Sequence, residues 1–207
     1  LLRIPRTGYN NQASITSELM WLESLREAGL AVPEPIHAQN GALFVHVDTP
    51  EMPDGRVCSL LRWMQGKFYA EEATEEHYRP LGEVMAKLHQ HTQHWKPPAE
   101  FNRRRWDWEG HFGDAAGFNQ SAEKVWGLIP DKYRPRFETI AEQTRLLMEK
   151  LGENPATFGL IHADLHLWNV IFNRVDGKLN AYPLDFDDCG YAHWVYDIAA
   201  ALGDETE

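Results

Sequence analysis

Four polar side chains that can do chemistry lie within the apolar stretch LIHADLHLWNV, residues 160–170. They are His162, Asp164, His166 and Asn169. A polar group placed in apolar surroundings is costly unless a partner replaces the hydrogen bonds that it made to water. The spacing allows two interpretations: a metal-binding cluster built on the two histidines, or a catalytic loop built on the aspartate and the asparagine.

The following segment can bring another carboxylate to this loop. The residues VIF and the run that leads to Asp185 are typical of strands, and Asp176-Gly177 between them is typical of a tight turn. Such a hairpin returns the chain to its starting point. We therefore expect Asp185 to lie close to Asp164 and Asn169.

Oxygen-bearing side chains of this kind suit a hard cation. Mg²⁺ usually keeps several waters and takes one or two carboxylates together with substrate phosphates. A hydrolytic zinc centre would need further ligands beside the two histidines, with one position left open. The residue types therefore favour magnesium over zinc.

Composition restricts the class of protein. The 207 residues are 43% hydrophobic, enough to bury a core in one large domain or two small lobes. The formal net charge of −11 argues against a nucleic-acid-binding protein, because phosphate binding rests on lysine and arginine. An acidic surface is compatible with a cationic small substrate or simply with solubility.

Two further features bear on compartment and partners. Cys58 and Cys189 are not in CxxC spacing, so the sequence predicts no disulfide framework and no structural zinc, and it fits a reducing cytoplasm. The sequence has no run of about 18 apolar residues that could span a bilayer, and we expect no membrane partner. The chain lacks an initiating methionine and is expected to be an excerpt.

The elements that must position these residues begin with a helix. Residues 12–30, QASITSELMWLESLREAGL, carry one apolar stripe at helical spacing, formed by Ile15, Leu19, Leu22 and Leu25. Glu18 lies on the same stripe, where an unpaired carboxylate would be costly. Arg3, in the apolar run LLRI, is the expected cationic partner.

Strands and further helices follow. Asn40-Gly41 predicts a hairpin between its flanking segments, and VCSLLRWM (57–64) predicts a strand that ends at a hinge, WMQG (63–66). Helices are expected over 75–95, capped by Thr74, and over 135–152, with an irregular loop at 96–113. The histidines of HQHTQH (89–94) are expected on an exposed helix end.

The spacing of the polar residues is similar to that of a known family. Asp164, then Asn169, then a hairpin and Asp185-Phe186 resemble the HxDxxxxN and DFG-type pair of kinases. The segments HADLHLWNVIF and LDFDDCG resemble those of the aminoglycoside phosphotransferase and choline kinase superfamily, including its homoserine-kinase-like members. SELMWLESLREAGLAVPEPI, LLRWMQG and LGEVMAKLHQHT agree in order, so the resemblance covers essentially the whole chain.

This resemblance implies an α+β, protein-kinase-like two-lobe fold. Residues 1–65 would form a small mixed N-terminal nucleotide-binding lobe, and residues 66–207 a larger, mainly helical C-terminal catalytic lobe that contains the catalytic hairpin. Both lobes are expected to be incomplete. No glycine-rich turn precedes Arg3, and the chain stops at GDETE, short of the helices that usually build the acceptor pocket.

The resemblance also implies roles around the hairpin. Asp164 would be the base for a substrate hydroxyl, and Asn169 and Asp185 would hold Mg²⁺ against the phosphates of ATP. His162 would brace the loop. Asp197, in WVYDIAAAL, would buttress it.

Other roles concern the nucleotide. Arg3 and Glu18 match the family's strand-to-helix ion pair, although lysine is usual and arginine presents its donors differently; a purely structural salt bridge is the alternative. The hinge backbone at Arg62, Trp63 and Met64 would hold adenine, although any buried strand would show the same apolar pattern.

The acidic run DFDDCG has more carboxylates than one metal needs. Asp187 and Asp188 could bind a second Mg²⁺, attract an amine on the substrate, or cap the following helix.

These features together predict a phosphotransferase. The leading hypothesis is an ATP- and Mg²⁺-dependent kinase acting on a hydroxyl of a small, amine-bearing metabolite, with a homoserine-like or amino-alcohol acceptor favoured over an aminoglycoside. A catalytically silent nucleotide-binding or regulatory pseudokinase is the alternative, favoured by Arg3 in place of lysine and by the missing loop. A zinc hydrolase is the third reading, and the oligomeric state is left open.

Overall fold

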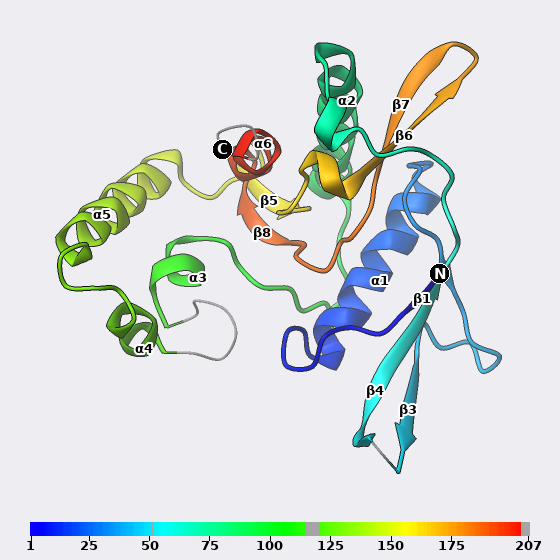
Figure 1. The fold of residues 1–207 in the computed structure, drawn as a ribbon, viewed down its shortest axis with the longest axis horizontal. Coiled ribbons are helices and arrows are strands. Elements are labelled where there is room, and N and C mark those ends of the chain that lie inside the picture. Colours follow the sequence, from blue (N-terminus) through cyan, green and yellow to red (C-terminus); the bar gives the residue numbers. More distant parts are fainter. Residues whose placement is uncertain (51, 115–120, 204–207) are drawn as a thin grey trace.

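The computed structural model describes residues 1–50, 52–114 and 121–203. A small sheet beside one long helix adjoins a larger, mainly helical portion (Figure 1). This architecture confirms the predicted α+β, two-lobe fold class.

The small sheet is organised around strand β4 (Met52–Leu61). Three shorter strands pair with it, all antiparallel: β1 (Leu2–Arg3), β2 (Pro35–Ile36) and β3 (Val45–Thr49). In the β1 register, Arg3 lies opposite Ser59. Pairing with β4 therefore fixes the position of Arg3 beside helix α1 (Gln12–Glu27), which is labelled in Figure 1.

The predicted hairpin at Asn40-Gly41 is wrong, although the turn itself forms. Gly41 has φ +81° and donates its N–H to Ala38 O at 2.9 Å. The strands on either side do not pair with each other, because each pairs with a different part of β4. A turn signal fixes local backbone geometry but does not decide which strands meet.

Helix α1 confirms the prediction from the apolar stripe. Asn11 caps its N-terminus, with the side-chain oxygen accepting from Ser14 N–H at 2.8 Å. All four predicted stripe residues are at most 3% exposed. They pack into one core with side chains from the helical portion, and Trp21 meets Phe186 edge-on with ring centroids 5.4 Å apart. This shared core fixes α1 against the candidate site.

The helical portion contains five α-helices among the described residues, together with two strand pairs and two short 3-10 helices. Helix α2 (Glu75–His94) follows Thr74, which is its N-cap as predicted. The other helices are α3 (Trp108–Phe112), α4 (Ala122–Gly127), α5 (Arg134–Leu151) and α6 (Val195–Gly203). The strands are β5 (Phe158–Ile161) with β8 (Gly190–His193), and β6 (Val170–Val175) with β7 (Lys178–Pro183).

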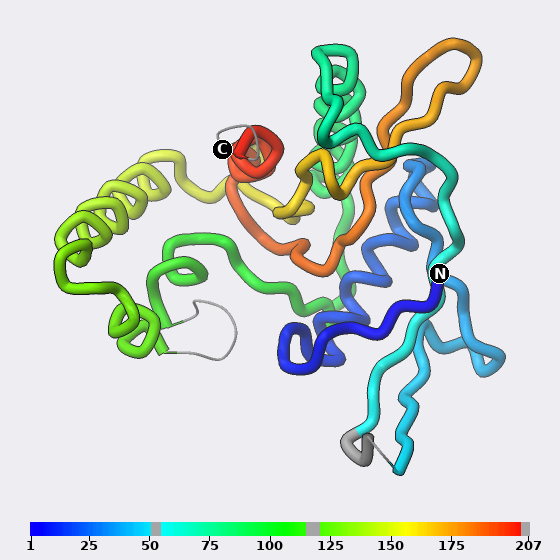
Figure 2. The backbone as a smooth tube through the Cα atoms, viewed as in Figure 1, coloured from blue at the N-terminus to red at the C-terminus, as the bar shows by residue number. Residues whose placement is uncertain are grey.

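The predicted strand at 57–64 stops earlier than expected. Strand β4 ends at Leu61, and Arg62 N–H then donates to Glu34 O at 2.8 Å. The chain continues past β6 toward α2 (Figure 2), and Lys67 exchanges two backbone hydrogen bonds with Phe172, at 2.8 and 2.9 Å. The connection between the two portions is thus tied to the hairpin that carries the site.

The expectation of an exposed histidine cluster is wrong for its first member. The His89 side chain is 14% exposed, and its Nε2 lies 2.8 Å from Asp197 Oδ2. It also stacks on Trp194, with ring centroids 4.7 Å apart. The sequence could not show this, because α6 supplies the partner from far along the chain.

Within the described ranges, the structure contains no helix that is both long and apolar enough to cross a lipid bilayer.

Candidate functional site

The hairpin β6–β7 and the turn before it position the polar residues as predicted. Two residues that flank the hairpin, neither of them a glycine, have left-handed backbone conformations: Ala163 with φ +69° and Asp185 with φ +56°. Such conformations cost about 1–3 kcal/mol each and occur often at functional sites. Ala163 is held by a hydrogen bond from its N–H to Asp197 Oδ1 at 2.8 Å.

Asp164 has one oxygen held by the neighbouring amide and remains accessible. Its Oδ2 accepts a hydrogen bond from Asn169 Nδ2 at 2.6 Å, and its Oδ1 lies 3.3 Å from His166 Nε2. The side chain is 40% exposed. It can therefore meet a small molecule from the solvent side while its orientation is held by Asn169.

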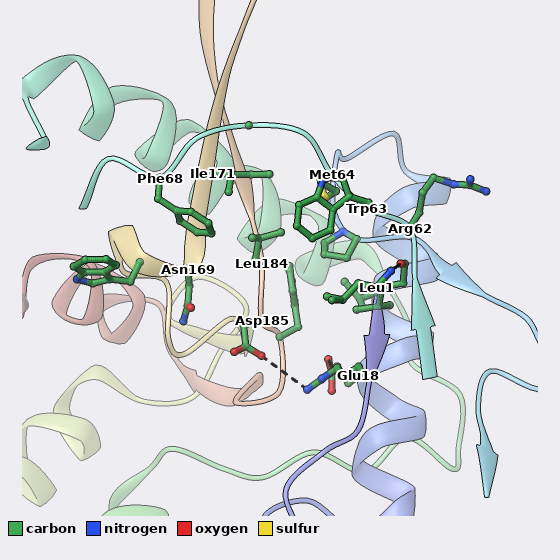
Figure 3. Close-up of a pocket in the computed structure, with 17 residues that line it drawn as sticks. Leu1, Glu18, Arg62, Trp63, Met64, Phe68, Asn169, Ile171, Leu184 and Asp185 are labelled. Atoms are coloured by element: carbon green, nitrogen blue, oxygen red, sulfur yellow. Dashed lines mark hydrogen bonds and ion pairs between the residues drawn. The ribbon is translucent and has the colours of Figure 1, made fainter. Parts of the chain in front are cut away.

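Asn169 and Asp185 lie at the open end of the hairpin, just before β6 and just after β7. Leu184 N–H donates to Asn169 O at 2.7 Å, so Asp185 follows directly after the residue that pairs with Asn169. Both side chains project into the same part of one cavity (Figure 3). Because Asn169 also contacts Asp164, the structure brings all three residues into one neighbourhood.

This donor set fits a hard divalent cation. Asn169 turns its amide nitrogen toward Asp164, and the amide oxygen is then the atom left to face a metal. The Asp185 carboxylate is 54% exposed on the same cavity. An amide oxygen and a carboxylate, with room for waters and phosphates, are the ligands that Mg²⁺ takes.

The zinc interpretation is not supported. His162 is fully buried, its Nδ1 accepts from Asp164 N–H at 3.3 Å, and its Nε2 then donates to Leu184 O at 2.8 Å. His166 Nδ1 accepts from Trp168 N–H. In residues 1–50, 52–114 and 121–203, no three His, Cys, Asp or Glu side chains are placed to hold a metal. His162 instead connects the loop to the residue before Asp185.

Asp197 lies underneath the turn at residues 162–164 with no exposed surface. Its Oδ1 accepts from Ala163 N–H, and its Oδ2 from His89 Nε2 and, at 3.4 Å, from His162 N–H. Several hydrogen-bond donors replace the water that a buried carboxylate has lost. This geometry is that of a buttress for the loop.

Arg3 and Glu18 form the predicted ion pair. Arg3 Nη1 contacts Glu18 Oε1, and Nη2 lies 3.9 Å from Asp185 Oδ1 and 3.6 Å from Asp187 Oδ2. Burial disfavours the charged form of Arg3, but Glu18 and the two aspartates outweigh it and raise the pKa of Arg3. Arginine thus bridges α1 to the acidic loop with both of its terminal nitrogens.

We expect Arg3→Met to lower the free energy of unfolding by about 3 kcal/mol, because it leaves a buried carboxylate without its partner. Glu18 is 1% exposed. Urea unfolding followed by circular dichroism measures the change. Arg62→Met is the matched control, because Arg62 pairs with Glu34 at the surface, where we expect a much smaller loss. Equal losses in both variants would contradict a special role for the Arg3 pair.

The cavity is large enough for a nucleotide-sized ligand. Its volume is about 390 Å³, and apolar residues dominate its lining, including Leu1, Leu22, Pro33, Leu61, Ile171, Leu184 and Phe186. Arg3, Glu18, Asn169 and Asp185 supply its polar side. Ligand sites usually combine an apolar lining with a few such convergent polar groups.

The three hinge residues line the cavity in different ways. Trp63 and Met64 face it, whereas the Arg62 guanidinium is directed away and donates to both carboxylate oxygens of Glu34 (Figure 3). Gly66 packs tightly, because a Cβ atom there would lie 2.9 Å from Phe172 O. A glycine is therefore required where the hinge passes β6.

Asp187 and Asp188 do not cap a helix, so that interpretation is wrong. Strand β8 follows them, and α6 begins only at Val195. Asp188 Oδ1 accepts from Tyr9 OH and lies 3.6 Å from Arg104 Nη1. Burial, together with the Asp185 and Asp188 carboxylates, raises the pKa of Asp187 to about 7 despite Arg3. A cation near these three carboxylates would stabilise their charged forms.

Two aromatic cavity residues were not predicted. Phe68 and Trp168 line the cavity and are 53% and 50% exposed. Trp168 lies inside the motif HLWN, next to Asn169, which was the available signal. Phe68 follows the hinge and has no comparable signal in its surroundings.

Comparisons with known proteins identify a family and several similar chains. The model of the phosphotransferase enzyme family matches residues 1–207. An amicoumacin kinase of Bacillus subtilis (strain 168) is 29% identical over 209 residues, which cover 98% of this chain and 56% of that protein. This chain spans little more than half the length of the curated relatives it matches.

Solved structures share the fold. A microcompartment-associated aminopropanol kinase superimposes with a TM-score of 0.73 at 29% identity, over 97% of this chain and 61% of that one. An amicoumacin kinase in complex with AMP-PNP, Ca²⁺ and Ami gives a TM-score of 0.76 at 23% identity, over 98% of this chain and 56% of that one.

Proposed function

The chain belongs to the phosphotransferase enzyme family, and on this premise we propose that the full-length protein is a small-molecule kinase. It transfers the γ-phosphoryl group of ATP to a hydroxyl of a small, amine-bearing metabolite, with Mg²⁺ as cofactor. The observation that carries this proposal is the contact between Asp164 and Asn169 beside a cavity that Asn169 and Asp185 share.

The two portions of the chain have different roles. In this proposal residues 1–65 form part of the nucleotide-binding lobe and residues 66–207 form the catalytic lobe. The apolar end of the cavity accepts the base, and the backbone at Trp63 and Met64 contacts it. Arg3, oriented by Glu18, faces the phosphates from the opposite side, a position supported by its reach toward Asp185.

Asp164 acts on the acceptor. Its carboxylate accepts the proton of the substrate hydroxyl as the oxygen forms a bond to the γ-phosphorus. The bond from that phosphorus to the bridging oxygen breaks at the same time, and ADP leaves with the electron pair. Asn169 Nδ2 keeps the carboxylate oriented by the hydrogen bond described above. His162 and Asp197 hold the backbone of this turn.

Asn169 and Asp185 would hold Mg²⁺ at the phosphates. When bound, such an ion neutralises charge on the transferred group and orients it. The two residues present their oxygens from the open end of one hairpin, where the Leu184–Asn169 backbone hydrogen bond holds the two strands together. Little rearrangement is then required when the nucleotide arrives.

Negative charge near the acceptor side supports an amine-bearing substrate. Asp164 lies on the loop before β6, Asp187 and Asp188 lie on the loop after β7, and the net charge of the chain is −11. Two relatives at 29% identity are an aminopropanol kinase and an amicoumacin kinase. A short amino alcohol fits these observations better than an aminoglycoside does, because no specific feature of the cavity favours an aminoglycoside.

The test is ATP turnover by the full-length protein. We expect ADP to form with Mg²⁺ and an amino alcohol, and we expect little ADP with the matching alcohol that lacks the amine or with EDTA in place of Mg²⁺. A coupled assay over amino alcohols, amino acids and aminoglycosides measures this. Thermal stabilisation by ATP without ADP formation on any acceptor would instead indicate the silent nucleotide-binding module.

A further inference from the structure

A buried arginine outside the catalytic hairpin holds the loop that carries Asp185 and Asp187. Arg103 is 5% exposed. Its Nε donates to Cys189 O and its Nη2 to Asp187 O, both at 2.5 Å, and its Nη1 donates to Ser14 O at 2.9 Å. Only the planar guanidinium fork can serve three carbonyls in these directions at once; a lysine ammonium cannot.

The chain around this arginine lies against the same loop. Trp106 Nε1 donates to Asp188 O at 2.7 Å, so the carbonyls of residues 187–189 all accept hydrogen bonds from this segment. The packing is close, because a Cβ atom on Gly190 would lie 2.6 Å from Arg104 O. The loop therefore has little freedom to shift relative to its support.

Arg103 also connects the loop to helix α1. Ser14 lies one helical turn before Glu18, which pairs with Arg3. Arg3 in turn reaches Asp187 Oδ2 at 3.6 Å. The side chain of Asp187 is thus held through Arg3 and its backbone through Arg103, and both arginines are anchored on α1.

We propose that Arg103 is a positioning residue that sets where Asp185 stands relative to the Arg3–Glu18 pair, and that it thereby controls affinity for metal-bound nucleotide. This inference rests on the proposed function. Groups that orient metal ligands from behind commonly change metal affinity by about 10- to 100-fold when they are lost. Arg103 does not line the cavity, and its hydrogen bonds go to the three carbonyls above and not to Asp164.

The test compares two nucleotide affinities in Arg103→Lys, which keeps the charge and loses the fork. Calorimetry with AMP-PNP, in Mg²⁺ or in EDTA, measures both in the full-length protein. We expect Mg²⁺-bound AMP-PNP to bind at least about 10-fold more weakly than to the parent. The metal-free affinity should match the parent's. Arg105→Lys is the matched control, because Arg105 contacts Asp107 and Glu153 at the surface.

A second readout needs no nucleotide. Amide hydrogen exchange over residues 187–191 should be faster in Arg103→Lys than in the parent, and unchanged in Arg105→Lys. Asn10→Ala provides an independent variant should Arg103→Lys fail to fold. Asn10 Nδ2 donates to the same Asp187 carbonyl at 2.9 Å, from a half-buried loop, and its loss should weaken only the Mg²⁺-bound form.

The outcomes separate this inference from the function it rests on. Unchanged Mg²⁺-bound affinity in folded Arg103→Lys, or an equal loss with and without metal, would overturn the positioning role alone. A parent protein that binds AMP-PNP no better with Mg²⁺ than with EDTA would contradict the proposed function, and this inference with it.

Discussion

We expect Asp164→Asn to lower kcat by about 100- to 10,000-fold, the usual contribution of a general base. Asparagine keeps the size of the side chain and can still accept the hydrogen bond that Asn169 donates to Asp164. It cannot take up a proton from the acceptor hydroxyl. Affinity for Mg²⁺-bound nucleotide and the free energy of unfolding should therefore stay close to the parent values.

Steady-state kinetics with the best acceptor from the panel measure this loss. Asp176→Asn is the matched control, since Asp176 lies in the exposed turn at the other end of the hairpin, and its φ of +49° is one that asparagine tolerates. We expect parent activity for the control. An unchanged kcat in Asp164→Asn would show that Asp164 is not the base.

The second large effect is expected from Asp185→Asn. Asparagine can adopt the φ of +56° at this position, whereas most other residues would add backbone strain. The substitution removes the one charged ligand of the proposed metal site. We expect kcat/KM to fall by more than about 100-fold. Losing a direct metal ligand should cost more than losing a group that only orients such a ligand, which commonly costs about 10- to 100-fold.

This loss should depend on metal in a way that the loss at Asp164 does not. Raising the Mg²⁺ concentration should restore part of the activity of Asp185→Asn, because the defect is in metal affinity, and none of the activity of Asp164→Asn. Titrations of activity against Mg²⁺ for both variants measure the difference. Identical metal dependence in parent and Asp185→Asn would contradict a metal-binding role for Asp185.

Local patterns predicted the hairpin and its polar residues because these lie close together in sequence. Asp176-Gly177 forces the chain back on itself, which brings the residues before β6 next to those after β7. The apolar stripe on α1 likewise predicted both the helix and the need for a partner at Glu18. In each case one short segment contains the whole signal.

Features that depend on distant segments could not be predicted in this way. The turn at Asn40-Gly41 formed, yet β4 rather than its neighbour became the partner of each flanking strand. Arg103 was assigned only to an irregular loop. Its acceptors are backbone carbonyls of Ser14, Asp187 and Cys189, and any residue type offers a carbonyl. Such contacts leave no trace in residue identity.

The central claim is that Asn169 and Asp185 share one divalent ion beside Asp164. The most direct test is a crystal structure of the full-length protein with AMP-PNP and Mn²⁺, with the metal located by anomalous scattering. We expect a peak about 2.1 Å from an oxygen of each residue, a distance typical of a small octahedral cation. Mn²⁺ bound to the nucleotide elsewhere on the acidic loop, with Asn169 or Asp185 outside its coordination shell, would contradict the claim.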